Sequence, residues 1–357
     1  MKTRRTAHRC AAAAGFGLAE VMVGVAIALI VVLGVQRVVI ATESVRRNAQ
    51  SDAETLQTAQ FALARIAFEI SNAGAGIATA SRALALCPAS SDFASMTRPV
   101  AVVITDGGAA DAPDSVVVRY AVDPATVLPL RVAAAAAGSG SFSLRAPLAV
   151  ASGDQLVVTD RRGGCARTTV TSVRDLGGGI ADIQHDTAVP DLPVDAMAVD
   201  LGAIERVVAT RFDVSGGTLR TTDLQGGDAP NPLISNVVNL KLQYGVDVDG
   251  DGTLDSWAAA NTATGLGDWS ADAVLRAPVE SLRRIKAVRV GVLVRGEQFD
   301  RAATAAYDWV MFDCDAADKR TCPGRLAGTI AGNARGGWHY RVYESVIPLR
   351  NLLWQRS

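Results

Sequence analysis

A run of 20 mostly apolar residues near the N-terminus is the feature that most constrains what this chain can fold into. It extends from Phe16 to Val35 with the sequence FGLAEVMVGVAIALIVVLGV, and Glu20 is its only charged residue. As a helix the run would be about 30 Å long, which matches the hydrocarbon core of a bilayer. The charged residues that precede this run are all basic. The positive-inside rule therefore places the N-terminus in the cytoplasm and the rest of the chain across the membrane.

Three kinds of segment share this general character. A secretory signal peptide has a shorter apolar core and a small-residue cleavage site at its far end. Here the apolar character continues through residues 38–41 into a helical pattern. A plain membrane anchor fits the length but gives no role to Glu20, because a carboxylate inside an apolar span costs roughly 2.5–3.5 kcal/mol. A processed segment whose acid has a partner accounts for both the length and the acid.

Gly15 and Phe16, with Glu20 at the fifth position of the chain that begins at Phe16, carry a family resemblance. They resemble the class III signal of type IV pilins and type II secretion pseudopilins. The resemblance implies cleavage between Gly15 and Phe16 by a prepilin peptidase and N-methylation of Phe16. It also implies that Glu20 pairs with the Phe16 ammonium of a neighbouring subunit during assembly. The sequence departs from the usual family pattern at Gly17 and Ala19.

The helix is expected to continue beyond the membrane as an amphipathic segment. Apolar residues alternate spacings of three and four along one face, at Leu56, Ala59, Leu63, Ile66 and Ile70. Gly74 and Gly76 predict an end near Asn72, which gives a helix about 85 Å long. We therefore expect a leader at 1–15 and a helical region at 16–76, with 16–41 in the membrane or filament core and 42–72 amphipathic.

Blocks in the helix and the C-terminal third resemble one branch of the pilin superfamily. They are QFALARIAFEISNAG at 60–74, LQYGVDVDGDG at 242–252, IKAVRVGVLVR at 285–295 and YRVYESVIPLRN at 340–351. Their order and style are similar to PilW-type minor pilins, whereas 80–235 shows no such resemblance. The resemblance implies an α+β fold in which a long N-terminal helix packs on a large β-rich head.

The head is expected to occupy residues 77–357 and to consist mainly of strands. Gly216-Gly217 lies between two strand-like runs and predicts a hairpin. The alanine-rich stretch at 133–137 predicts a surface loop. The strand-like runs are 100–105, 115–122, 155–160, 168–174, 205–214, 218–223, 236–247, 286–295 and 338–348.

Cysteine usage predicts disulfide bonds. Cys10 lies in the leader, and four cysteines remain in the part expected outside the cytoplasm. The short segment from Cys314 to Cys322 favours a local bridge, which leaves Cys87 with Cys165. Four buried free thiols are the alternative. No pair has zinc-ribbon spacing, so a zinc site is not expected.

An acidic loop predicts a Ca²⁺ site. Asp247, Asp249, Asp251 and Asp255 stand at positions 1, 3, 5 and 9 of an EF-hand-like pattern with glycine at position 6. Thr253 would offer its backbone carbonyl at position 7. Oxygen ligands select Ca²⁺ over zinc or copper. The usual glutamate at position 12 is missing, and a solvated Asp/Gly turn is the alternative.

No sequence motif indicates catalysis, so we do not expect an enzyme: a P-loop, a zinc-protease motif and a nucleophile elbow are all missing. A formal net charge of −1 gives no reason to expect nucleic-acid binding.

The PilW resemblance implies a minor pilin that primes or joins type IV pilus assembly and serves attachment, twitching motility or DNA uptake. Its implied partners are minor and major pilins, prepilin peptidase, the inner-membrane assembly machinery and a tip adhesin. It would be a single-pass inner-membrane protein with a periplasmic head, later found in the pilus at the cell surface. The alternatives are a minor pseudopilin of a type II secretion system and a membrane-anchored periplasmic protein that binds calcium or another ligand.

Overall fold

The computed structural model describes most of the chain and confirms the expected fold class, a long N-terminal helix followed by a β-rich region. The described residues are 17–77, 83–89, 97–121, 129–136, 140–203, 207–227, 229–262, 265–300, 305–314, 322–332 and 337–353. Gly15, Phe16 and the expected leader lie outside them. The chain divides into two compact units, Met1–Ser51 and Asp52–Ser357.

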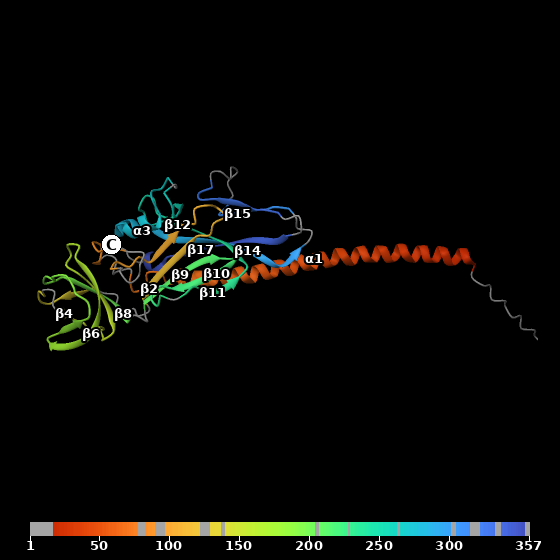
Figure 1. Cartoon of the computed structure of the whole chain (residues 1–357). Helices are drawn as coiled ribbons and strands as arrows, with labels where there is room; N and C mark the ends of the chain where they lie inside the picture. The colour runs from red at the N-terminus through yellow and green to blue at the C-terminus, as the bar shows by residue number, and fades with distance from the viewer. Residues whose placement is uncertain are drawn as a thin grey trace, which may run out of the picture. The chain divides into compact units, whose positions relative to one another are not determined.

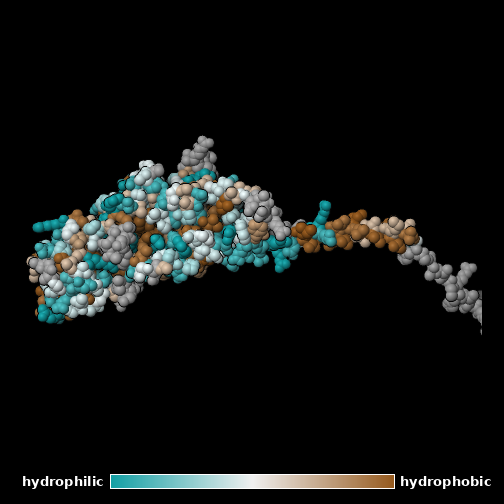
Figure 2. Space-filling view, viewed as in Figure 1, coloured by the Kyte–Doolittle hydropathy of each residue, from teal (hydrophilic) through white to brown (hydrophobic). Residues whose placement is uncertain are grey.

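The first unit consists, in its described part, of the N-terminal portion of helix α1 (Leu18–Asn72). Its large apolar side chains are exposed around the helix, from Leu18 at 82% to Ile40 at 69%. Figure 2 shows them as a mainly brown, hydrophobic stretch. The helix is long and apolar enough to cross a membrane. Burial of this stretch therefore requires surroundings other than the unit's own chain.

In the second unit α1 buries one face. Ala59, Ala62, Ile66 and Ile70 are at most 1% exposed, spaced three and four residues apart. The sequence prediction placed Leu56 on this face, but its side chain is 42% exposed, and Ala62 is buried instead. Because the apolar stripe shifts gradually around a helix with 3.6 residues per turn, not every predicted position stays on the buried face. The small residues at 59 and 62 indicate where the helix packs closely on the head better than the leucines do.

The described part of the second unit also contains the short helices α3 (Ala271–Arg276), α4 (Val279–Leu282) and α5 (Arg350–Leu353). Its strands are β1 (Val102–Thr105), β2 (Ser115–Ala121), β3 (Leu130–Val132), β4 (Ser141–Arg145), β5 (Asp154–Thr159), β6 (Cys165–Gly177), β7 (Ile180–His185), β8 (Met197–Ala203), β9 (Val207–Ser215), β10 (Thr218–Asp223), β11 (Asn231–Ser235), β12 (Val237–Val246), β13 (Ser256–Ala259), β14 (Ile285–Asp300), β15 (Tyr307–Met311), β16 (Leu326–Ile330) and β17 (Gly337–Pro348).

These strands form four antiparallel groups. One sheet has the order β1-β2-β9-β10-β11 and a second has the order β13-β12-β14-β17. The hairpin β15-β16 forms a third group, and β3-β4-β7-β6-β5-β8 closes into a barrel. Figure 1 shows β4, β6 and β8 gathered in one group and β12, β14 and β17 in another. The expected hairpin at Gly216-Gly217 is present, since β9 and β10 pair across these residues.

The main core lies between α1 and the two larger sheets. It combines the buried face of α1 with apolar side chains of β2, β12 and β14, and with Trp269 and Leu275 near α3. β12 and the central part of β14 are almost wholly buried, because the sheet is covered on both faces. The hairpin β15-β16 covers the other face with Trp309, Met311 and nearby Phe312.

The barrel is an insertion into the first sheet. Ala121, the last residue of β2, pairs directly with Val207, the first residue of β9. The chain between them forms a closed barrel with an apolar cluster of its own, which includes Phe142, Leu156 and Ile183. The alanine-rich stretch expected as a loop links β3 to β4 in its described part, 133–136.

The barrel packs on the sheet through one wall. Val157 of β5 and Val199 of β8 point away from the barrel interior and contact Ile77, Ala121 and Val207 in a third apolar cluster. All six residues of β5 are buried; Leu156 and Val158 belong to the apolar cluster of the barrel, and Val157 belongs to this contact. The disulfide between Cys87 and Cys165 joins the two sides of the same contact.

Candidate functional site

Polar contacts fix the second part of α1 against the head. Asp52 and Arg341 form an ion pair of 3.0 Å, and the Thr55 hydroxyl lies 3.0 Å from the Tyr343 hydroxyl. Further along, Glu69 accepts a hydrogen bond of 2.8 Å from the Tyr120 hydroxyl.

Glu69 was not singled out from the sequence, although it occupies the buried face between Ile66 and Ile70. Its carboxylate is 3% exposed and pairs with Arg65 at 2.7 Å. Burial raises the pKa of the Tyr120 hydroxyl, and the bond to Glu69 adds to this effect. An acid at a stripe position was the signal that could have found it, because a buried carboxylate requires a partner.

The C-terminal block holds the end of α1. The side-chain amide of Asn351 donates to the carbonyls of Ser71, Asn72 and Ala73, at 3.2–3.4 Å. These are carbonyls at the helix terminus, which have no partner within the helix. The block at 340–351 and the block at 60–74 therefore meet in space: the chain from β17 into α5 contacts α1 from Arg341 at Asp52 to Asn351 at Asn72.

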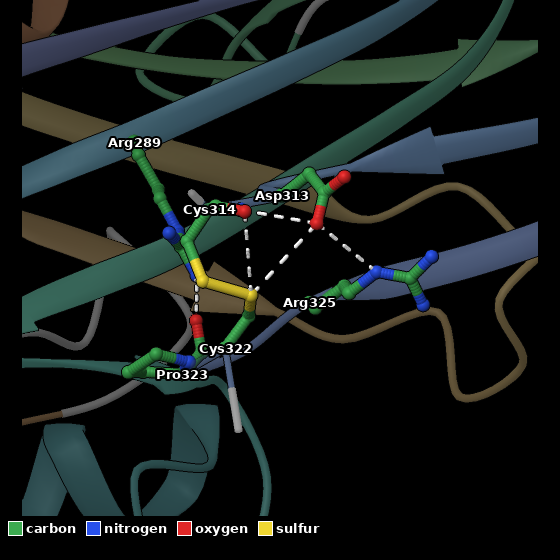
Figure 3. The surroundings of a disulfide bond; sticks show 6 residues. All are labelled: Arg289, Asp313, Cys314, Cys322, Pro323 and Arg325. Carbon is green, nitrogen blue, oxygen red and sulfur yellow. Dashed lines mark hydrogen bonds and ion pairs between the residues drawn. A yellow bond between two sulfur atoms is a disulfide. The ribbon is translucent and has the colours of Figure 1, made fainter. Parts of the chain in front are cut away.

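The disulfide Cys314–Cys322 lies beside a buried arginine, as Figure 3 shows. The Arg289 guanidinium donates to the carbonyl of Pro323, the residue that follows Cys322. Asp313, which precedes Cys314, pairs with Arg325 at 3.3 Å. The bridge thus closes a loop whose two ends are both fixed by arginines.

Arg289 lies between two aromatic rings. Its guanidinium carbon is 4.7 Å from the ring centre of Trp257 and 4.4 Å from that of Phe312. It also donates to the side-chain carbonyl of Gln243, whose amide nitrogen donates to the carbonyl of Gly324 at 2.7 Å. Burial lowers the pKa of Arg289 to about 10, against the opposing charge of Glu344. Stacking and hydrogen bonding together hold this cation in the head.

The acidic loop joins β12 to β13 and brings three of its four aspartates together. Carboxylate oxygens of Asp247, Asp249 and Asp255 lie within 4.8 Å of one another. Asp251 is not part of this group, since its carboxylate accepts from the N–H and the hydroxyl of Thr253, each at 2.7 Å. These bonds lower the pKa of Asp251.

Hydrogen bonds within the loop preorganise Asp247. Its carboxylate accepts from the N–H groups of Gly250 at 2.6 Å and Gly252 at 2.9 Å, and Lys286 lies 3.2 Å away. Desolvation opposes ionisation, but these donors outweigh it and lower the pKa of Asp247. Arg284 donates to the carbonyl of Asp247 at 2.7 Å and to that of Val248. The Asp247 carboxylate is therefore held in place with Lys286 close to it and Arg284 at the neighbouring backbone carbonyls.

Glu20 lies in the first turn of α1, and its side chain is exposed in the first unit. Its expected partner group, the amine of Phe16, lies outside the described residues. The pairing of Glu20 with this amine therefore stays a prediction.

The comparison with family models gives a match in the C-terminal part of the chain. Residues 207–351 match the family model described as type IV Pilus-assembly protein W, PilW. This C-terminal region is of the PilW type. The matched range begins at the first residue of β9 and ends within α5, so it contains the PilW-like blocks at 242–252, 285–295 and 340–351. The PilW-type region excludes the inserted barrel and the block at 60–74.

Among solved structures, the chain is similar to a type IV-like pilin from Thermus thermophilus. The two share 15% sequence identity, and the alignment covers 56% of this chain and 85% of the other, with a TM-score of 0.23. The search of curated proteins gives no match. The match to PilW indicates a role connected with the type IV pilus.

Proposed function

We propose that this protein is a minor pilin that is processed by prepilin peptidase and primes or joins the assembly of a type IV pilus. The observation that carries the proposal is the PilW-type region, which includes the strand β17 and the asparagine that hold α1. The pilus would serve attachment, twitching motility or DNA uptake. The protein would start as a single-pass inner-membrane protein with a periplasmic head.

The proposed assembly mechanism rests on the part of α1 that lies in the first unit. Its apolar side chains are exposed on all sides, so they gain most from a bilayer or from packing among the helices of other pilins. In such surroundings the Glu20 carboxylate needs a cation. Cleavage after Gly15 would create one at Phe16, and pairing between subunits would then fix the axial position of each helix.

Mass spectrometry of the N-terminus of the native protein tests this function. The expected species begins with N-methylated Phe16, and an intact Met1 would overturn the proposal. Glu20→Ala should strongly reduce the amount of this subunit in sheared pili. Glu43→Ala is the matched control, because Glu43 is an exposed acid on the same helix beyond the apolar run. Equal incorporation of both variants would contradict the assigned role of Glu20.

The two alternatives predict different outcomes. A minor pseudopilin of a type II secretion system would leave pili intact and abolish secretion when its gene is deleted. A membrane-anchored periplasmic binding protein would keep its N-terminus and tolerate Glu20→Ala. Loss of pili with intact secretion supports the minor pilin.

We also propose that the acidic loop binds Ca²⁺ and stiffens the turn between β12 and β13. The converging oxygens of Asp247, Asp249 and Asp255 support this, as does the repulsion among three carboxylates that a cation would relieve. Lys286 and Arg284 already neutralise part of this charge, so the affinity should fall in the range of roughly 10⁻⁴–10⁻³ M found for extracellular sites.

Titration calorimetry of the full-length protein in detergent, after removal of metals by chelation, tests the calcium site. One Ca²⁺ should bind to the wild type. Asp249→Asn should weaken binding, whereas Asp251→Asn is the matched control because that carboxylate lies outside the converging group. If no heat of binding is measured at millimolar Ca²⁺, the proposed calcium site is wrong.

A further inference from the structure

The two larger sheets have four outer strands, and β17 differs from the other three. β1 and β13 have four residues each, and β11 has five, including Pro232. β17 has 12 residues, and its only proline is the last one, Pro348. Natural sheets protect their edges with short strands, prolines, bulges or covering segments. Among the described residues, β17 is paired on one side only, and no strand covers its outer edge.

The hydrogen-bond register identifies which backbone groups face this edge. The N–H of Leu349 donates to the carbonyl of Lys286, so odd-numbered residues of β17 point their backbone groups toward β14. In an antiparallel ladder alternate residues point to opposite sides. The N–H and C=O groups of Val342, Glu344 and Val346 therefore point outward, at a spacing of two residues.

Both faces of β17 already make contacts within the head, unlike its outer edge. On one face Tyr343 contacts Thr55 of α1, and Ile347 is buried in the main core. On the other face Val342 packs against the cluster beneath β15-β16. Glu344 accepts a hydrogen bond of 2.7 Å from the N–H of Phe312. The strand is therefore held rigidly in an extended form with its outer backbone groups presented in a row.

One exposed side chain next to this row is apolar. Val346 is 59% exposed and lies directly opposite Arg289 in the neighbouring strand. A partner strand would cover it with a side chain on the same face. The alternating donors and acceptors fit an extended polypeptide, because neither a helix nor a lipid surface offers matching backbone groups at this period.

We propose that the outer edge of β17 binds an extended strand of a different, neighbouring pilus subunit by β-strand addition. This inference rests on the proposed function, because it names a partner surface for the assembled subunit. The partner supplies backbone groups to Val342, Glu344 and Val346 and an apolar residue beside Val346.

Val346→Pro and Val346→Thr in the full-length protein form a matched pair that tests the backbone contact. Proline removes the outward N–H and is tolerated on edges where that group faces solvent, whereas threonine keeps the N–H and the β-branched shape. In cells that make the pilus, Val346→Pro should lower the amount of this subunit in sheared pili at least tenfold, with Val346→Thr close to wild type. Equal incorporation of both would overturn the proposal.

Two further measurements keep the test decisive if Val346→Pro fails to fold. A photo-reactive phenylalanine at position 346 should cross-link to another pilus subunit in the filament, and a cross-link to a second copy of this chain would overturn the proposal. In the wild type, the amides of Val342, Glu344 and Val346 should exchange at least tenfold more slowly in pili than in the purified protein. Equal exchange would overturn it.

Failure of the proposed function has a different outcome. In that case wild-type protein itself would be missing from sheared pili, and the edge proposal would fall with it. Incorporation of the wild type and of both variants at equal levels would overturn the edge proposal alone.

Discussion

Ala121 and Val207 lie directly opposite each other on adjacent antiparallel strands, although the whole barrel is inserted between them. The sheet thus closes across the insertion as if β2 and β9 were the two arms of a hairpin. The barrel has its own apolar interior, and the PilW-type region begins where the barrel ends. The barrel is therefore an insertion between two strands that pair directly with each other.

Replacing residues 122–206 by Asn-Gly should leave a folded head. The two residues suit the type I′ turn that joins paired strands, and Cys87→Ser removes the thiol left without Cys165. Circular dichroism should show one cooperative transition at a lower Tm, because Ile77 and Val207 lose their apolar cover. A chain without a cooperative transition would show that the barrel is part of the folding core. Cys87→Ser with Cys165→Ser in the otherwise intact chain is the control.

The two disulfides should contribute unequally to stability. Cys87 and Cys165 are 78 positions apart, whereas Cys314 and Cys322 are 8 apart. The loop-entropy relation gives about 4.5 kcal/mol for the long loop and about 2.5 kcal/mol for the short one. Urea unfolding of the two paired Cys→Ser variants measures the free energies. A larger loss from the short loop would contradict this expectation and point to contacts of the Pro323 turn with Arg289.

Gly324→Ala should destabilise the head more than Gly216→Ala. Both glycines have positive φ, +67° and +58°, so alanine strains the backbone at either site by about 1–2 kcal/mol. At Gly216 the added methyl group meets open space, but at Gly324 it overlaps the Gln243 carboxamide and lies 2.6 Å from an Arg289 nitrogen. This overlap should add about 1–3 kcal/mol. Denaturant unfolding of both variants measures the difference in the free energy of unfolding. Equal losses of stability would show that the side chains of Gln243 and Arg289 move freely to accommodate the methyl group.

Acid should remove a contribution of Asp186 to the stability of the barrel. The pKa of Asp186 is lowered to about 2, mainly by the hydrogen bond from the N–H of Thr169 and also by those from the hydroxyls of Thr187 and Thr168. An unfolded aspartate has a pKa near 3.9, so the contribution is complete above about pH 4 and is lost as the pH falls toward 2. The Tm difference between wild type and Asp186→Asn should be constant from pH 7 to 5 and shrink below pH 4.

Asp191→Asn is the control for this experiment, because Asp191 is exposed on the following loop. A Tm difference for Asp186→Asn that stays constant down to pH 2 would contradict the assigned hydrogen bonds.

Local sequence patterns predicted the elements that depend on near neighbours. The apolar run, the helix end at Asn72 before Gly74, and the Gly216-Gly217 hairpin all follow from periodicity and turn chemistry. The nine strand-like runs correspond to strands of the two larger sheets and to β5 and β6. Long strands with buried faces repeat their pattern often enough to be recognised from residues close in the chain.

The other strands depend on partners far away in the sequence. β3 has three residues, and its pairing with β4 and β8 makes it a strand. The sequence patterns did not predict β4, β7 and β8 for a related reason. Only closure of the barrel determines which face of each strand is buried and which is exposed. Likewise β15 and β16 are strands because Trp309 and Met311 cover a sheet formed elsewhere.

For the candidate sites, sequence alone located Glu20, the four cysteines and the acidic loop. Tertiary structure decided that Asp251 turns to Thr253, that Lys286 reaches Asp247, and that the outer edge of β17 stays unpaired among the described strands. Residues that interact within a turn or along a helix are constrained by chain geometry, and their pattern is visible in the sequence. Contacts between residues far apart depend on which surfaces fold against each other, and that is fixed only when the whole core is packed.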